Sequence, residues 1–243
     1  MLLLQIGDRP FRRAGDTADL ETQGVNREKA ESIQDAIALI ELYDFDVVTI
    51  DLDIVPNGAS ARDHAVLRAV RAVSRVPIVG LTTSPDPQVT IRALDFGADD
   101  VLTRLCSLEE TLARLRAVVR RTEGHAQTIL RCGPLELSMS DRTVRIDGAP
   151  VRLGPKEFAL LELLMLKRGR PVNKTACLSH LYGVDEYPDL KTIDVIVCRL
   201  RRKLAACGLP DIVANIWGMG FAVKPDAGQS RLAAGPTALM AAE

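Results

Sequence analysis

The sequence lacks the features that would mark a membrane or secreted protein. No apolar run approaches the roughly 18 residues of a membrane-spanning helix. The apolar start Met1–Leu4 has no basic region and is cut short by Asp8 and Arg9, so it makes a poor signal peptide. The five cysteines are scattered, without a Cys-x-x-Cys pair or a nearby His that would complete a zinc set. We therefore expect a cytoplasmic protein with reduced thiols and no membrane partner.

The short motifs of the common enzyme classes are missing too. The sequence holds no P-loop, no Gly-x-Gly-x-x-Gly after a strand and no triad of His with Cys or Ser. We interpret the protein as a non-enzyme. Its 243 residues, 47% of them hydrophobic, suffice for one large domain or two ordinary ones with real cores.

Charge divides the chain into two halves. Residues 1–124 carry 15 Lys and Arg against 20 Asp and Glu, a net charge of −5. Residues 125–243 carry 16 against 12, a net charge of +4. This split indicates two modules, the second of which faces a polyanion.

In the first half, short apolar runs alternate with helical patterns, which is typical of an α/β doubly wound domain with a parallel sheet. Apolar residues at helical spacing predict helices around Ile33, Val66 and Leu108, and a further helix is expected within residues 12–22. We place this domain at residues 1–121 and a polar linker at residues 122–128. The expected strands are Leu2–Ile6, Val25–Ala30, Val47–Ile50, Ile78–Leu81 and Val101–Thr103.

The second half predicts an α+β domain at residues 129–226, followed by a disordered Ala/Gly-rich tail at residues 227–243. A small antiparallel sheet comes first, then three helices and a hairpin around Trp217-Gly-Met-Gly220. The sheet segments are Leu135–Leu137 and Val144–Ile146, the helices begin at Pro155, Asn173 and Asp189, the third ends at Gly208, and the hairpin strands are Ile212–Ile216 and Phe221–Val223.

Four polar residues follow the expected strands of the first half: Asp8, Asp51, Thr82 and Arg104. Ligands bind at the carboxyl ends of the strands in an open α/β sheet, so we expect these side chains to converge on one edge. Asp8 and Asp51 could share a divalent metal ion such as Mg²⁺. Thr82 and Arg104 could hold the oxygens of a phosphoryl group on Asp51.

This pattern resembles a response-regulator receiver domain. The resemblance rests on Val48-Thr-Ile-Asp-Leu-Asp53, on Thr82 and on Phe96-Gly-Ala-Asp-Asp100 before the last strand. It implies a flavodoxin-like strand order of 2-1-3-4-5, with Asp51 as the phosphoacceptor and Thr82 as the switch hydroxyl.

Three residues depart from the receiver pattern. Gly7 stands where receivers carry an acid, Arg104-Leu105 replaces Lys-Pro, and Val101 replaces the switch aromatic. Losing one carboxylate predicts a weak or absent Mg²⁺ site, so no cofactor is expected. An Arg fork also differs in geometry from a Lys point charge.

Three interpretations of Asp51 therefore stay open. It is a working phosphoacceptor served by a histidine kinase or phosphotransferase, it belongs to a degenerate receiver that acts without phosphorylation, or it is only a polar strand terminus. We favour the second, because the departures affect cation binding, phosphoryl clamping and signal read-out. Arg104 would then pair with Asp51 or Asp8 and mimic an active site without any ligand; alternatively, the site is vestigial and the domain only dimerises.

The third helix of the second half buries one face, with Ile193, Val197, Leu200 and Leu204 at helical spacing. We expect its other face, including Ile196, to point outward. Lone basic helices are more often solvated surfaces than nucleic-acid ligands. Here, however, a preceding helix, a turn and a Gly-rich hairpin suggest a helix-turn-helix with a wing.

Residues 130–224 resemble the OmpR/PhoB class of winged-helix regulators through Lys156-Glu-Phe158, Thr192-Ile-Asp-Val195, Arg199–Leu204 and Trp217-Gly-Met-Gly-Phe221. The resemblance implies sequence-specific binding to double-stranded DNA. Residues that it assigns to bases are Thr192, Val195 and Arg199, and we assign Lys191, Arg201 and Arg202 to phosphates and Trp217 and Met219 to the wing.

Within that class, the chain is similar to the CtrA group of bacterial cell-cycle regulators, through Gly124-His-Ala-Gln127, His180-Leu-Tyr-Gly183 and Trp217-Gly218 among other segments. That group has an Arg where this chain has Met219, which puts minor-groove contact in doubt. The class also implies a homodimer paired through Asp95, Asp100, Arg114 and Arg121, and it allows RNA polymerase as a partner. A protein-binding adaptor that no longer recognises DNA is the alternative from another class.

Overall fold

A computed structural model describes residues 1–7, 20, 22–53, 61–184 and 188–224, with the backbone alone described for residues 61–64. The chain divides into two compact units. The first comprises residues 1–128 and 174–193, and the second comprises residues 129–173 and 194–243. None of the helices in the described ranges is long and apolar enough to cross a membrane.

The first unit is built on a five-stranded parallel sheet with the order β2-β1-β3-β4-β5. This order confirms the flavodoxin-like prediction, including the strand expected near Val25–Ala30. Polar positions at the ends of β3, β4 and β5 thereby come to the same edge of the sheet. The strands are β1 (Leu2–Ile6), β2 (Asn26–Ala30), β3 (Val47–Asp51), β4 (Ile78–Thr82) and β5 (Asp100–Thr103).

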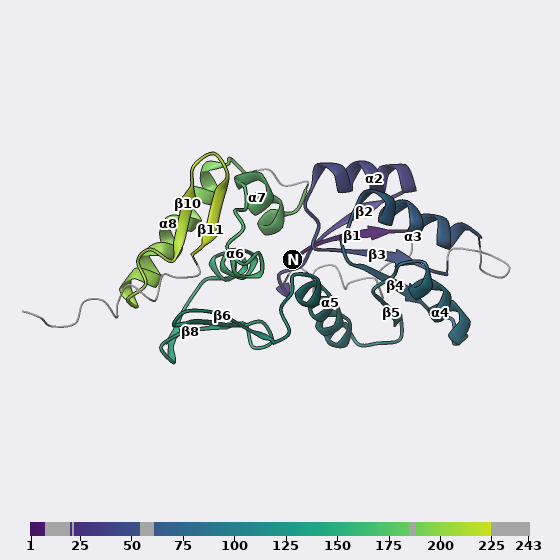
Figure 1. Ribbon diagram of the computed structural model, residues 1–243, viewed down its shortest axis with the longest axis horizontal. Coiled ribbons are helices and arrows are strands. Elements are labelled where there is room, and N and C mark those ends of the chain that lie inside the picture. Colours follow the sequence, from purple (N-terminus) through teal and green to yellow (C-terminus); the bar gives the residue numbers. More distant parts are fainter. Residues whose placement is uncertain (8–19, 21, 54–60, 185–187, 225–243) are drawn as a thin grey trace, which may run out of the picture. The chain divides into compact units, whose positions relative to one another are not determined.

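Helices cover both faces of this sheet, with α2 and α3 on one face and α5 on the other (Figure 1). Ser32 and Ser107 cap α2 and α5, because their side chains accept the main-chain N–H of Asp35 and Glu110. Among the described residues up to 128, the helices are α2 (Ile33–Leu42), α3 (Ala61–Val73), α4 (Pro87–Asp95) and α5 (Leu108–Thr122).

The sequence patterns do not predict α4, although its start carries two helix signals. The Asp86 side chain caps it by accepting the N–H of Gln88, and Pro87 occupies the first turn. Only Ala93 is buried within the helix, so its apolar stripe is too short to be recognised. The helix expected within residues 12–22 falls almost wholly outside the described residues.

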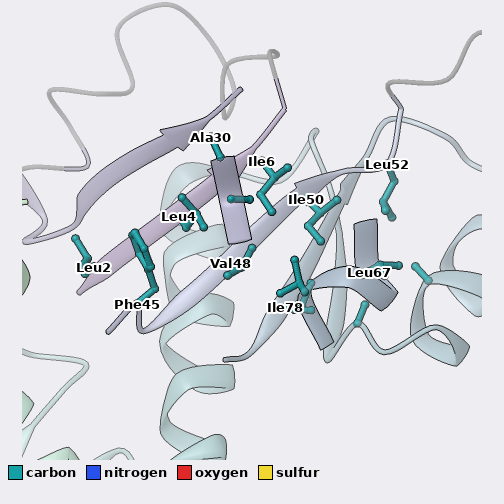
Figure 2. Packing of buried hydrophobic residues seen from close by; sticks show 14 of the residues in the cluster. Leu2, Leu4, Ile6, Ala30, Phe45, Val48, Ile50, Leu52, Leu67 and Ile78 are labelled. Carbon is teal, nitrogen blue, oxygen red and sulfur yellow. The ribbon is translucent and has the colours of Figure 1, made fainter. Parts of the chain in front are cut away.

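Apolar side chains from the sheet and from α2, α3 and α4 pack into a core on one side of the sheet, which helps to fix the strand ends that carry the pocket (Figure 2). Leu4 and Val48 are fully buried on neighbouring strands, and Leu67 on α3 packs onto the same layer. Burying a side chain of this size contributes roughly 1.5–3 kcal/mol, so the strand register is strongly specified.

The segment 174–193 belongs to the first unit, whereas the sequence analysis places it within residues 129–226. Helix α7 (Lys174–Tyr182) lies in this segment, where Asn26 Nδ2 donates to the His180 carbonyl at 2.7 Å. His180 Nδ1 also lies 3.0 Å from Asp46 Oδ2. Burial would raise the pKa of Asp46, but the charge and hydrogen bond of His180, together with the N-terminal charge and the Leu2 N–H, hold that pKa well below its ordinary range.

The second unit opens with a four-stranded antiparallel sheet in the order β6-β7-β8-β9 and continues with α6, most of α8 and a hairpin. The predicted strands at 135–137 and 144–146 are present, and β6 and β9 extend the sheet on both sides. Val172 pairs with Phe221 across an isolated bridge, which ties the hairpin to the chain after α6. The elements are β6 (Ile129–Cys132), β7 (Leu135–Ser138), β8 (Thr143–Ile146), β9 (Ala149–Val151), α6 (Pro155–Leu166), α8 (Lys191–Ala206), β10 (Val213–Ile216) and β11 (Gly220–Val223).

Candidate functional site

Helix α8 buries the stripe that its sequence predicts. Ile193, Val197, Leu200 and Leu204 are all at most 2% exposed. The expectation for Ile196 is wrong, because this side chain is only 7% exposed. Three residues after Ile193 and four before Leu200, it widens the buried stripe rather than facing a partner.

The opposite face of α8 is exposed and basic. Lys191, Val195, Arg199 and Arg202 are exposed, and Thr192 is half-buried. The Asp189 carboxylate accepts the main-chain N–H of Lys191 at 2.8 Å and so caps the first turn. The residues with predicted base contacts, from Thr192 to Arg199, therefore lie along the first half of the helix, on the side away from the buried stripe.

Two basic residues near the end of α8 are instead engaged within the protein. Arg201 Nε donates to the Val213 carbonyl at 2.9 Å, and its guanidinium lies over the Phe221 ring, 5.9 Å from the centroid. Lys203 Nζ lies 2.6 Å from Glu157 Oε2, which also accepts the Gly154 N–H at 2.7 Å. Burial would raise the pKa of Glu157, but these hydrogen bonds and the Lys203 charge lower it. Arg201 thus holds α8 to the hairpin, and Lys203 holds it to α6.

The turn of the β10–β11 hairpin presents Trp217 and Met219, which are 95% and 57% exposed. Gly220 at its base has a φ of +117°. A Cβ on Gly220 would lie 2.0 Å from the Val172 carbonyl oxygen, so only glycine permits the close approach of the two segments. The sequence pattern predicts the hairpin but not the close approach of Gly220 to Val172, because Val172 lies far away in the chain.

In the first unit, Asp51 and Arg104 form a buried ion pair at the predicted edge of the sheet. Arg104 Nη2 lies 2.8 Å from Asp51 Oδ2, and their side chains are 9% and 2% exposed. The other Asp51 oxygen accepts the main-chain N–H of Asp53 at 2.9 Å. The guanidinium therefore neutralises the carboxylate at which the resemblance places the phosphoryl group.

Asp53 is a member of this pocket that the sequence analysis does not single out. Its carboxylate accepts the Thr82 hydroxyl at 2.6 Å, and it accepts the Thr83 N–H and hydroxyl at 2.6 and 2.8 Å. Arg104 Nε lies 3.8 Å from Asp53 Oδ2. The available signal was spacing, since residues two apart at a strand end point the same way.

In the described part of this pocket, a cationic side chain stands where the sequence pattern allows a Mg²⁺ ion. Both carboxylates are directed at one guanidinium, whereas a divalent ion needs several oxygen ligands at close range. Within the described ranges, no three His, Cys, Asp or Glu side chains gather as metal ligands. Asp8, the other predicted ligand, lies outside those ranges.

The predicted dimer residues lie on α4, β5 and α5. Asp95 and Arg121 are exposed, and Arg114 pairs with Glu110 of its own helix at 3.0 Å. Asp100 is half-buried and accepts the Val101 N–H. Ile91 and Leu94 on α4 are also exposed, at 47% and 44%. Ile91 and Leu94 therefore form a small apolar strip on α4 beside Asp95 of the same helix, which the sequence patterns do not identify.

Two parts of the chain match known families, and the second match includes the segment 174–193 that groups with the first unit. The response regulator receiver domain matches residues 3–116, and the family described as transcriptional regulatory protein, C terminal, matches residues 148–223. The chain is 36% identical over 211 residues to the cell cycle response regulator CtrA of Brucella anthropi, which covers 86% of this chain and 89% of that protein. CtrA of Brucella ovis gives the same identity and coverage.

A solved structure also matches, though at low similarity. It is the response regulator DrrB of Thermotoga maritima, described as an OmpR/PhoB homolog, with 19% identity and a TM-score of 0.39. The match covers 91% of this chain and 98% of that one.

The receiver and the C-terminal regulatory domain together define a DNA-binding response regulator of the OmpR/PhoB class with a winged helix. Within that class, the chain belongs to the family of the cell cycle response regulator CtrA. These matches confirm the family predicted from the sequence.

Proposed function

We propose that this protein is a sequence-specific transcription regulator that binds DNA as a dimer in the cytoplasm and does so without phosphorylation. The observation that carries the proposal is the buried pair of Arg104 and Asp51, with 2.8 Å between Nη2 and Oδ2. A receiver controlled by phosphorylation needs its acceptor carboxylate available to a phosphodonor. Here that carboxylate is already neutralised by the chain itself.

The proposed DNA surface is the exposed face of α8. Arg199 contacts a guanine edge through its planar fork, and Val195 contacts a thymine methyl. Lys191 and Arg202 contact phosphates, which adds affinity without sequence preference. Arg201 makes a phosphate contact only with the part of its guanidinium that does not hold the Val213 carbonyl.

Independence from phosphorylation follows from charge. A phosphoryl group adds about 1.5–2 negative charges. Next to Asp51 it would meet the Asp53 carboxylate and would have to compete for Arg104. The site is therefore proposed to work without Mg²⁺, and a histidine kinase or phosphotransferase is not required as a partner.

The proposed dimer forms through α4, β5 and α5 of the receiver. Ile91 and Leu94 supply apolar area at its centre, and Asp95 and Arg121 pair across the two-fold axis. Exposed ion pairs contribute about 0–1 kcal/mol each, so the apolar strip provides most of the affinity. Replacing Leu94 by Glu in the full chain is expected to leave a monomer in sedimentation; an unchanged dimer would contradict this interface.

A second candidate function is a protein-binding adaptor, which the apolar turn of the hairpin favours. Trp217 is 95% exposed, and Met219 lacks the positive charge that suits a minor-groove contact. RNA polymerase or another regulator would then bind that turn. The basic face of α8 has no role in this alternative.

Selection from a random pool of DNA, with unmodified full-length protein, separates the two functions. The regulator is expected to enrich a defined sequence, and the adaptor none. Arg199→Ala is then expected to cost roughly 1–3 kcal/mol on the selected site and to relax one base position. Lys191→Ala serves as the matched control and is expected to weaken all sequences alike, with a salt slope lower by about one unit. An equal loss for Arg199→Ala on selected and random DNA would exclude base contact.

A further inference from the structure

One carboxylate in the receiver pocket holds donors that the sequence analysis assigned to a phosphoryl group. Asp53 Oδ1 accepts the Thr82 hydroxyl at 2.6 Å, and Asp53 Oδ2 accepts both the N–H and the hydroxyl of Thr83. The Nε atom of Arg104 lies 3.8 Å from the same Oδ2. Two hydroxyls and a main-chain amide that donate to one carboxylate, with a guanidinium charge just beyond hydrogen-bond distance, make an oxyanion site.

The position of Asp53 in the chain, just after β3, explains how its carboxylate reaches those donors. It follows β3 directly, two residues after Asp51, and its N–H donates to Asp51 Oδ1 at 2.9 Å. Thr82 is the last residue of the neighbouring strand β4. Two adjacent strand ends therefore bring the acceptor and the donors together without any external molecule.

The electrostatics agree with an ionised Asp53 in this position. Burial would raise the pKa of Asp53, but the hydrogen bonds from Thr82 and Thr83 and the charge of Arg104 lower it overall. The donors thus stay occupied by a carboxylate at neutral pH. A tethered carboxylate has already lost most of the freedom that a free anion would lose on binding, so it competes strongly with one.

We propose that Asp53 is a built-in ligand of the oxyanion site, which holds Thr82 and Arg104 in the arrangement that a bound phosphoryl group would otherwise impose. The proposal rests on the phosphorylation-independent function proposed above and names the residue that replaces the phosphoryl group. Asp53 acts through Thr82 and Arg104 and is a positioning residue. Removing its carboxylate leaves a site for a small carboxylate or a tetrahedral oxyanion.

The test uses full-length Asp53→Ala with acetate and inorganic phosphate as probes, each matched by chloride at equal ionic strength. We expect either anion to raise the melting temperature of Asp53→Ala with increasing concentration and to leave the wild type unchanged. Operator affinity should fall by about tenfold in Asp53→Ala and recover when acetate is added. A loss of packing alone would give neither response.

Two further variants keep the proposal testable if Asp53→Ala does not fold. Asp53→Asn fills the same volume without the charge, so its operator affinity should fall and acetate should not restore it. Thr82→Val should lower the affinity by a similar factor, and the double variant should be no weaker than either single one. Additive losses, wild-type affinity in Asp53→Asn, or a folded Asp53→Ala that ignores both anions would overturn the proposal. If acetyl phosphate instead tightens DNA binding by the wild type, the proposed function itself fails.

Discussion

Arg104 in the receiver and Arg199 on α8 carry the same functional group, but the guanidinium of Arg104 is buried and that of Arg199 is exposed. The Arg104 side chain is 9% exposed and lies between two carboxylates, whereas Arg199 is exposed on the basic face of α8, where its charge is one of the weaker causes that lower the pKa of Glu157. A buried guanidinium must be compensated by the chain itself, because its desolvation costs several kcal/mol. An exposed one remains hydrated until a phosphate or base edge replaces the water.

The comparison distinguishes a charge that stabilises the fold, on Arg104, from a charge that is available to bind DNA, on Arg199. Arg201 stands between the extremes, since it binds the Val213 carbonyl and still lies on the basic helix. Variants of these residues should therefore change stability in the receiver, DNA affinity on α8, and both properties at Arg201.

Replacing Arg104 by Ala should have the largest effect. It removes the guanidinium that lies beside both Asp51 and Asp53, and removing one partner of a buried pair costs about 3–5 kcal/mol. Urea unfolding of the full-length protein would measure this loss for the receiver transition. Arg114→Ala is the control, since its pair with Glu110 is half-exposed and contributes about 0–1 kcal/mol. Equal losses in the two variants would contradict the structural role of Arg104.

Replacing Gly220 by Ala should have the next largest effect. The new Cβ would overlap the Val172 carbonyl oxygen, so the hairpin must move away from the strand bridge that holds it. Gly218→Ala is the control, because a Cβ there meets nothing within 4 Å and only its φ of +70° is unfavourable. We expect that control to cost roughly 1–3 kcal/mol and Gly220→Ala to cost more, with weaker operator binding by filter assay. Equal behaviour of the two would show that the close approach is not needed.

Arg201→Ala and Arg202→Ala should differ in stability although both residues lie on α8. Arg201→Ala removes a hydrogen bond to β10 and should lower the free energy of unfolding by roughly 1–2 kcal/mol, besides weakening DNA binding. Arg202→Ala should leave stability unchanged and reduce the salt slope of DNA binding by about one unit. Unfolding curves and affinities across a salt series give both quantities. A stability loss in Arg202→Ala equal to that in Arg201→Ala would remove the distinction.

The smallest effect concerns pH. The pKa of Asp53 is lowered in the folded protein, so the folded state binds fewer protons at this residue than the unfolded state does. Its stabilisation is complete above the unfolded value of about 3.9 and is lost as the pH falls through the folded value. The difference in unfolding free energy between wild type and Asp53→Asn should thus stay constant from about pH 5 to 8 and shrink below about pH 4. A change within the neutral range would mean that another group controls the site.

Sequence patterns predicted the elements with long apolar signals and missed those without them. The sheet order, α8 and the hairpin follow from periodicity and family resemblance, whereas α4 buries only Ala93 and leaves too little pattern to recognise. Ile196 shows the limit of a helical wheel, because the width of a buried stripe depends on what packs against it.

The pocket was predicted in part for a similar reason. The pairing of Arg104 with Asp51 was one of the sequence-based expectations, since both follow strands that end at one edge. The role of Asp53 was not, because its partners Thr82 and Thr83 come from another strand. Spacing within one segment shows that two carboxylates are neighbours. It does not show which of them accepts hydrogen bonds from the residues at the end of the next strand.

The central claim is that the receiver site is complete without a phosphoryl group. Its most direct test is the affinity of full-length protein for its selected operator before and after treatment with acetyl phosphate and Mg²⁺, with the intact mass measured on the same samples. We expect no added phosphoryl group and no change in affinity. One added phosphoryl group together with a tightening of tenfold or more, about 1.4 kcal/mol, would contradict the claim.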